Sequence, residues 1–240
     1  MIMFVIFSLV LAISLPLYAH AQEKIPLYLS IAAHNETAND KVMRFIELSL
    51  FELLERNPDK MSEEQRKISI DLADFVFNSY TIFERPDSWH ATCLYIGNNS
   101  SQTETDIYKN FVEGVEVDLV TSTFLYIPGK LMAAPLFFKD FKLIENKFPH
   151  MTLMIGFKNV YRAVDSNYLL RAMFEDNEEL KEKYHSGEIE NENVSLYRHL
   201  KNVKITFDDT KKELIEENVY VLKSKEVLTL QAYTLKNYAS

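Results

Sequence analysis

The chain contains two short apolar segments of the same kind, WHATCLYIG at residues 89–97 and FPHMTLMIG at residues 148–156. In each segment a histidine stands two positions before a threonine, at the start of an apolar run that ends at a glycine. A run of this length, rich in Leu, Ile, Tyr and Met, is typical of a buried β-strand. Because side chains two apart on a strand point to the same face, we expect each histidine to lie beside its threonine.

The histidines are His90 and His150, and the threonines are Thr92 and Thr152. If the two strands lie together, they present two imidazoles and two hydroxyls to one cleft. Histidine has an ordinary pKa of about 6.5, so near neutral pH one ring can accept a proton while the other donates one. The hydroxyls can hydrogen-bond to phosphate oxygens and offset the charge that develops on them. This set of groups is sufficient for acid–base chemistry on a phosphate, without a metal or other cofactor.

In this context the two segments resemble the signature motifs of the two-histidine (2H) phosphoesterases. This family includes tRNA-ligase phosphodiesterase domains and 2′,3′-cyclic nucleotide phosphodiesterases. The second segment is the closer match. The stretch AVDSNYLL at residues 163–170 also resembles the segment after the second motif in tRNA-ligase-like members. The resemblance covers roughly residues 85–175.

The resemblance implies a bilobal α+β fold, with two small antiparallel sheets around a central groove and helices outside. Each lobe would contribute one His-x-Thr strand to the groove. The implied activity is metal-independent hydrolysis of 2′,3′-cyclic phosphates of nucleotides or RNA ends. On this ground His150 is the base toward water, His90 is the acid, and Thr92 and Thr152 bind substrate. The reverse order of acid and base also fits the residues.

Other functions fit the same residues. Some members of the family cleave 2′–5′-linked oligoadenylate, and a module on this fold could bind a nucleotide without hydrolysing it. A histidine beside a threonine on an apolar strand is also often a hydrogen-bonded core pair. A zinc site is disfavoured, because no His, Cys, Asp and Glu set at ligand spacing accompanies the histidines.

Further side chains near the motifs have weaker claims to a functional role. The only cysteine, Cys93, cannot form an internal disulfide, and we expect it to be a small buried hydrophobe. Lys130 follows a glycine in a predicted turn and is expected to be a solvated lysine rather than a phosphate ligand. The aromatic candidates for stacking on a base, each expected in the core or groove wall, are Trp89, Tyr95, Phe148 and Tyr161.

The charge of the chain limits its substrates. The formal net charge is -9, and the basic residues are scattered along the chain rather than clustered. Because binding of a long polyanion requires clustered positive charge, duplex nucleic acid is excluded as a partner. We therefore expect a small nucleotide or an RNA terminus as substrate, and a monomeric protein.

The N-terminus predicts export. Residues 1–19 are almost wholly apolar, and Ala19-His20-Ala21 has the small-x-small pattern of a cleavage site. We predict a signal peptide at residues 1–21, a secreted or lumenal protein, and no stable membrane association after cleavage. One feature departs from the signal-peptide pattern, since no Lys or Arg precedes the apolar run. A run of about 19 residues is also long enough for an uncleaved membrane anchor, which is the alternative.

The remaining residues, 22–240, are predicted to form a single bilobal domain, with residues 22–85 as an N-terminal helical hairpin packed on it. Helices are expected over residues 38–56, 62–80 and 166–184, with a short helix after residue 105 and a helical turn near 210–217. Besides the two motif segments, strands are expected over residues 115–119, 131–138, 203–207, 219–223 and 227–235.

Overall fold

The structure is a computed structural model of the 240-residue chain. It describes residues 24–33, 36–56, 59, 61–77, 83–84, 88–138, 142–156, 162–175, 195–207 and 213–239. The predicted signal peptide at residues 1–21 and Tyr161 lie outside these ranges. Within the described residues, no helix combines the length and the apolar character needed to span a bilayer.

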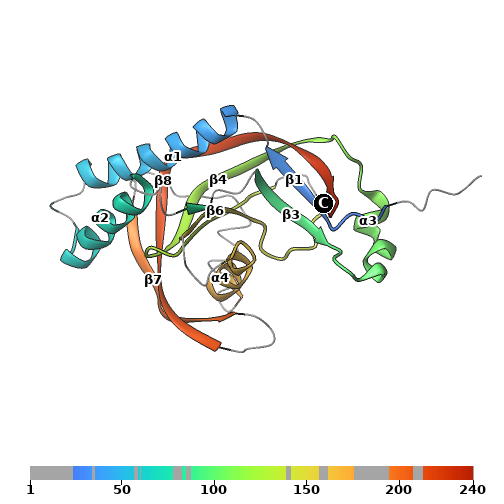
Figure 1. The fold of residues 1–240 in the computed structure, drawn as a ribbon. Coiled ribbons are helices and arrows are strands. Elements are labelled where there is room, and N and C mark those ends of the chain that lie inside the picture. The colour runs from blue at the N-terminus through green and yellow to red at the C-terminus, as the bar shows by residue number, and fades with distance from the viewer. Residues whose placement is uncertain are drawn as a thin grey trace, which may run out of the picture.

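Two helices form the predicted N-terminal pair, α1 (Glu36–Arg56) and α2 (Glu63–Phe77). They contact each other and pack against the sheet (Figure 1). At the start of α2 the N–H of Gln65 donates to the hydroxyl of Ser62 at 3.2 Å, and the N–H of Ser62 donates to the side-chain carbonyl of Gln65 at 2.9 Å. This reciprocal capping box fixes where α2 begins.

Eight strands form one antiparallel sheet in the order β2-β6-β5-β4-β8-β1-β3, with β7 paired to β8 off this path. Together with helices α3 (Asp106–Asn110) and α4 (Asp165–Phe174), this gives the α+β class that the sequence predicted. The strands are β1 (Tyr28–Ala33), β2 (Phe83–Glu84), β3 (Trp89–Tyr95), β4 (Glu116–Ile127), β5 (Leu131–Pro135), β6 (His150–Gly156), β7 (Ser195–Phe207) and β8 (Glu213–Asn237).

The sequence predicted two small sheets, whereas the observed pairings run continuously through all eight strands. The continuity lies in β4 and β8, which are longer than the segments predicted for them. Residues 116–126 of β4 pair with residues 220–233 of β8, with one irregularity between them. The predicted helical turn near 210–217 is wrong over residues 213–217, which belong to β8 and pair with β7. The sheet is bent, and the bend lies in the pairing of β4 with β8.

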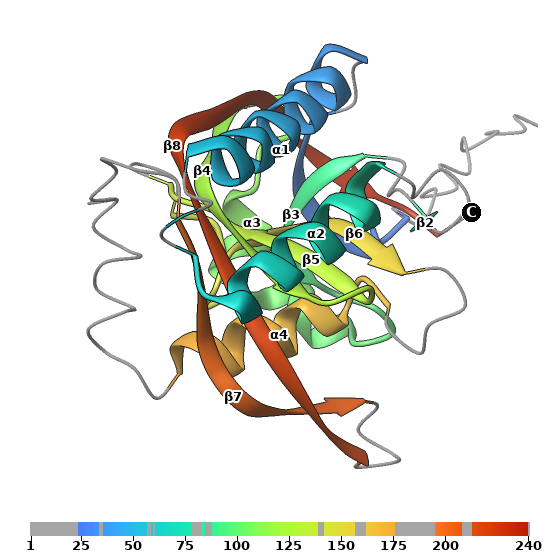
Figure 2. The same cartoon turned by 90° about the vertical axis from the view of Figure 1, so that its left-hand side faces the viewer.

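The bend comes from an irregularity in this pairing. Thr121 faces Leu228 and Thr123 faces Lys223, so residues 224–227 of β8 stand opposite Ser122 alone. Extra residues in one strand of an antiparallel pair bend it and increase its twist. Figure 2 shows β8 changing direction beside α1.

Buried hydroxyls bond the backbone on both sides of the bend. On β4 the hydroxyl of Thr121 donates to the carbonyl of Thr123 at 2.9 Å and accepts from its N–H at 3.3 Å. On β8 the hydroxyl of Ser224 accepts from the N–H of Glu226 at 3.1 Å and lies 2.8 Å from the hydroxyl of Ser49 on α1. The bend is therefore held without leaving these buried polar groups unsatisfied.

The helices cover opposite faces of the sheet. Along β5, Met132 and Ala134 belong to the core cluster under α1 and α2, whereas Leu131 and Ala133 belong to the cluster under α4. This alternation is the period of two expected for a strand buried on both faces. The half of the sheet that contains β1 and β3 leaves the face on the α4 side available for a site.

The strand β1 is absent from the sequence predictions. It pairs antiparallel with β3 on one side and β8 on the other. The N-terminal part of the chain therefore contributes a strand inside the sheet as well as the helical pair. Ala32 of β1 lies opposite His90 in this pairing, so β1 directly supports the strand that carries the first motif.

We expect the Thr121→Val variant to lower the free energy of unfolding by about 2 kcal/mol, because valine keeps the shape but removes the hydroxyl that bonds the backbone at the bend. Urea unfolding followed by circular dichroism measures this. The control is Thr229→Val on the exposed side of β8, which should change stability by less than about 0.5 kcal/mol. Equal effects of the two variants would contradict a structural role for the buried hydroxyl.

Candidate active site

The two motif strands are far apart in the sheet order but close in space. β3 forms one end of the order and β6 is next to the other end, yet their Cα atoms approach within 8 Å. The short β2 pairs with Ile155 and Gly156 at the far end of β6. Of the described strands, only β5 pairs with the part of β6 that carries His150 and Thr152.

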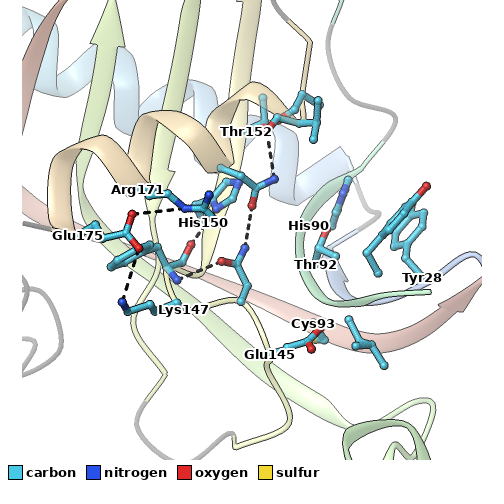
Figure 3. Close-up of a pocket in the computed structure, with 17 residues that line it drawn as sticks. Tyr28, His90, Thr92, Cys93, Glu145, Lys147, His150, Thr152, Arg171 and Glu175 are labelled. Carbon is cyan, nitrogen blue, oxygen red and sulfur yellow. Dashed lines mark hydrogen bonds and ion pairs between the residues drawn. The ribbon is translucent and has the colours of Figure 1, made fainter. Parts of the chain in front are cut away.

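A cavity of about 640 Å³ lies where these strands meet, and all four residues predicted from the motifs line it. Figure 3 shows His90 and Thr92 on one side of the cavity and His150 and Thr152 on the other, with α4 alongside. The remaining lining residues are Tyr28, Cys93, Leu94, Tyr95, Glu145, Asn146, Lys147, Phe148, Ala163, Val164, Asn167, Arg171 and Glu175.

The ring of His150 is held by its own backbone. It is 8 % exposed, and its Nδ1 lies 2.9 Å from the carbonyl oxygen of Phe148, two residues earlier. A carbonyl oxygen can only accept, so we assign the hydrogen of the neutral ring to Nδ1. The lone pair is then on Nε2, the nitrogen that remains for contact with a bound molecule.

The ring of His90 is held in the same way. Its Nδ1 lies 3.3 Å from the carbonyl oxygen of Ser88, also two residues earlier, and 3.4 Å from the hydroxyl of Ser88. The ring of Tyr28 packs beside it, with the ring centres 5.8 Å apart. The two motifs therefore share a hydrogen-bonding geometry as well as a sequence pattern. In both, Nδ1 is the ring nitrogen that bonds the backbone carbonyl.

The environment of the two rings differs. Burial lowers the pKa of His150 to about 4; the hydrogen bond to the carbonyl of Phe148 opposes this, and the nearby charge of His90 adds to it. His150 is therefore neutral at neutral pH and has a lone pair available. His90 is only half-buried.

The two threonines also differ. The hydroxyl of Thr152 lies 2.9 Å from the hydroxyl of Ser166, in the first turn of α4, and 3.3 Å from the carbonyl oxygen of Ala163, just before α4. Thr92 is half-buried and its side chain makes no hydrogen bond with the described residues. One hydroxyl is thus fixed to α4, whereas the other is free to bond a molecule in the cavity.

The α4 end of the cavity carries charged side chains that the sequence analysis did not single out as site residues. The carboxylate of Glu175 lies 3.6 Å from Nε of Arg171 and 3.9 Å from Nζ of Lys147. Asn167 precedes Arg171 by four positions, and Glu175 follows it by four, so the three residues lie on one face of α4. This spacing of four is the signal in the sequence that could have identified them.

The other candidate residues have varied positions. Trp89 is 4 % exposed and belongs to the core, as expected. Tyr95 and Phe148 both line the cavity, Tyr95 with an exposed ring and Phe148 with a buried ring that packs against Phe174. Lys130 is not among the lining residues.

The thiol of Cys93 is buried, as predicted. Burial raises its pKa to about 12, so the thiol remains protonated near neutral pH and is a poor nucleophile. Among the described residues there is no group of three or more His, Cys, Asp and Glu arranged to hold a metal ion.

Comparison with known proteins gives little more. No family model matches the chain, and no curated protein matches it. Among solved structures, the crystal structure of a fungal RNA kinase is similar at a TM-score of 0.44 and 14% sequence identity. The match covers 91% of this chain and 47% of that one, so the chain spans about half the length of that protein. A likeness at this level carries no argument about function.

The buried His150 should make stability depend on pH. In the unfolded chain the ring takes up a proton near pH 6.5, but in the folded protein it does so only near pH 4. The free energy of unfolding should therefore fall as the pH is lowered from 6.5 to 4, by up to about 1.4 kcal/mol per pH unit from this group.

Urea unfolding at pH 7 and at pH 5 tests this expectation against the His150→Asn variant. The asparagine amide can still donate to the carbonyl of Phe148 but does not titrate. The variant should lose less stability between the two pH values than the parent does. Identical losses would show that His150 titrates normally in the folded protein.

Proposed function

We propose that the chain is a metal-independent phosphodiesterase that hydrolyses 2′,3′-cyclic phosphates of nucleotides or RNA ends. One observation supports this above all. Two imidazoles from strands 60 residues apart line the same cavity, and each has its Nδ1 bonded to a backbone carbonyl. In this proposal, proton transfer on each ring is assigned to Nε2, the nitrogen that does not bond the backbone carbonyl, and a threonine follows two residues later on each strand.

In the proposed reaction His150 is the base. Its Nε2 takes a proton from water while the water oxygen bonds to phosphorus in line with one ribose oxygen. His90, protonated on Nε2, gives that proton to the ribose oxygen as its bond to phosphorus breaks. The product is a nucleoside monophosphate, and exchange of one proton with solvent restores both rings.

The assignment of the base follows the burial of the rings. The pKa of His150 is lowered to about 4, so its lone pair is present throughout the neutral range. The bound phosphate is an anion, and a nearby negative charge raises the pKa of an imidazole. Substrate binding therefore moves His150 toward the range in which a general base is effective. His90 is half-buried and can be charged at lower cost.

The hydroxyls bind the non-bridging oxygens of the phosphate in this scheme. Thr92 has no competing partner among the described side chains, so its hydroxyl can donate directly. The contacts with Ser166 and Ala163 keep the oxygen of Thr152 in place at the wall of the cavity. To donate to the phosphate, Thr152 accepts from Ser166 and turns its own hydrogen away from the long 3.3 Å contact with the carbonyl of Ala163. A donor held close to the phosphate oxygens stabilises the charge that develops on them.

The proposed substrate is small or is the end of a larger molecule. The charges along the cavity are mixed, since Glu145 and Glu175 line it together with Lys147 and Arg171. With a formal net charge of -9, the chain repels an extended polyanion. We also propose a secreted or lumenal monomer, with residues 1–21 as its signal peptide.

The purified protein should convert 2′,3′-cyclic AMP to a monophosphate in excess EDTA. His90→Asn and His150→Asn should each lower kcat by about 10²- to 10⁴-fold, since asparagine can replace the Nδ1 donor but cannot exchange a proton. Retained affinity for the product, with loss of turnover, separates an enzyme from a binding module. No hydrolysis by the parent, or hydrolysis abolished by EDTA, would contradict the proposal. Cleavage of 2′–5′-linked oligoadenylate alone would favour the alternative substrate.

The pH dependence of kcat/KM reports on the free enzyme. Because the pKa of His150 is lowered to about 4, the rate should begin to fall on the acid side only below about pH 5, rather than near pH 6.5. Steady-state rates between pH 4 and pH 8 measure this. An acid limb near pH 6.5 would mean that the essential base is not the buried ring.

A further inference from the structure

The cavity continues past the histidines along α4 to a pair of cations. Arg171 lies on the same face of α4 as Asn167, one turn further from its start, and Lys147 approaches from the segment before β6. The two cations flank the carboxylate of Glu175 (Figure 3). Nothing in the proposed hydrolysis of the cyclic phosphate uses these residues.

This charged end of the cavity is held in place from several directions. Nδ2 of Asn146 donates to Oδ1 of Asn167 at 3.0 Å, which ties the segment before β6 to α4. Nζ of Lys147 lies 5.5 Å from the centre of the Phe148 ring, within the range of a cation–π interaction. The relative positions of Lys147 and α4 are therefore set before any ligand binds.

The spacing along α4 corresponds to one nucleotide. Thr152, which faces the reacting phosphate in the proposed mechanism, is bonded to Ser166. Arg171 is five residues further along α4, or roughly 7.5 Å along the axis at 1.5 Å per residue. This is comparable with the separation of consecutive phosphates along a nucleic-acid strand. A phosphate one sugar away from the reacting one would therefore come level with Arg171.

We propose that Arg171 and Lys147 bind the 5′-phosphate of the nucleotide whose 2′,3′-cyclic phosphate meets the two histidines. This inference rests on the proposed function and narrows its substrate to nucleotides phosphorylated on the 5′ side, whether free nucleotides or RNA 3′ ends. The guanidinium of Arg171 and the ammonium of Lys147 can both donate hydrogen bonds to one phosphate. Such bonds are shorter than the contacts of 3.6 and 3.9 Å that the two groups make with Glu175.

In this scheme Glu175 holds the two cations in place while the site is empty. The contacts of Glu175 with Arg171 and Lys147 are long, and more than half of the side-chain surface of each cation is exposed. The two ion pairs are therefore weak, and breaking them costs little free energy. A phosphate that contacts both cations takes the place of the carboxylate. Its charge is higher than that of the carboxylate when it is a terminal phosphate, and equal to it when it is the diester of an RNA end. The simpler alternative is an exposed ion-pair network with no ligand.

The test compares kcat/KM for three substrates: adenosine 2′,3′-cyclic phosphate, its 5′-phosphorylated form, and adenylyl-adenosine 2′,3′-cyclic phosphate. The parent should prefer the two that carry a 5′-phosphate by about tenfold, as expected for a charge-assisted contact at a partly exposed site. Arg171→Gln and Lys147→Gln should each remove most of this preference and leave the rate on the first substrate within about twofold.

Two further variants serve as controls. Lys109→Gln removes an exposed lysine that also pairs with a glutamate, Glu104, at 3.0 Å, but lies outside the cavity, so it should leave the preference unchanged. Glu175→Gln should maintain or increase the preference, because it removes the competing carboxylate. A gain for the free 5′-phosphorylated nucleotide but not for the dinucleotide would limit the site to free nucleotides.

Binding measurements without turnover test the 5′-phosphate site independently of the proposed hydrolysis. The adenosine 2′,5′- and 3′,5′-bisphosphates should bind about tenfold more tightly than the corresponding monophosphates, and Arg171→Gln should remove the difference in calorimetry. If binding follows this pattern but no substrate is turned over, the phosphate site stands and the hydrolase proposal falls. If the 5′-phosphate gives no gain in binding or rate, or if both variants leave the gain intact, the inference is overturned.

Discussion

The structure depends on the pairing of β4 with β8 and on the bend within it. The two strands lie at the centre of the strand order, where β1 and β3 follow on the β8 side while β5 and β6 follow on the β4 side. Four residues of β8 stand opposite Ser122 at the bend, and the buried hydroxyls of Thr121 and Ser224 bond the backbone on either side of it. Because the sheet bends here, β3 and β6 come together although they are far apart in the order of strands.

The site that results is nearly symmetric in local geometry and asymmetric in environment. Each histidine donates its Nδ1 hydrogen to the carbonyl two residues earlier, so the same backbone geometry fixes both rings. His150 is buried under α4 and its pKa is lowered, whereas His90 is half-buried beside Tyr28. A difference in burial is a physical means of giving two identical side chains the separate roles of base and acid.

The sequence predicted the features that depend on local pattern. Both motif strands, the helices α1 and α2 and the four motif residues follow from periodicity and spacing. Residues 213–217, which are rich in helix-forming side chains, form a strand because pairing with β7 overrides that preference. β1, Lys147 and Arg171 were missed because their roles depend on partners that only the bent sheet brings near.

The central claim is that the two imidazoles act on one phosphorus atom. A crystal structure of the protein with adenosine 2′-phosphate bound tests it most directly. The account predicts a phosphate in the cavity with Nε2 of both His90 and His150 within about 3.2 Å of its oxygens, on different sides of the phosphorus. A phosphate bound elsewhere, or one that contacts only one of the two rings, would contradict the account.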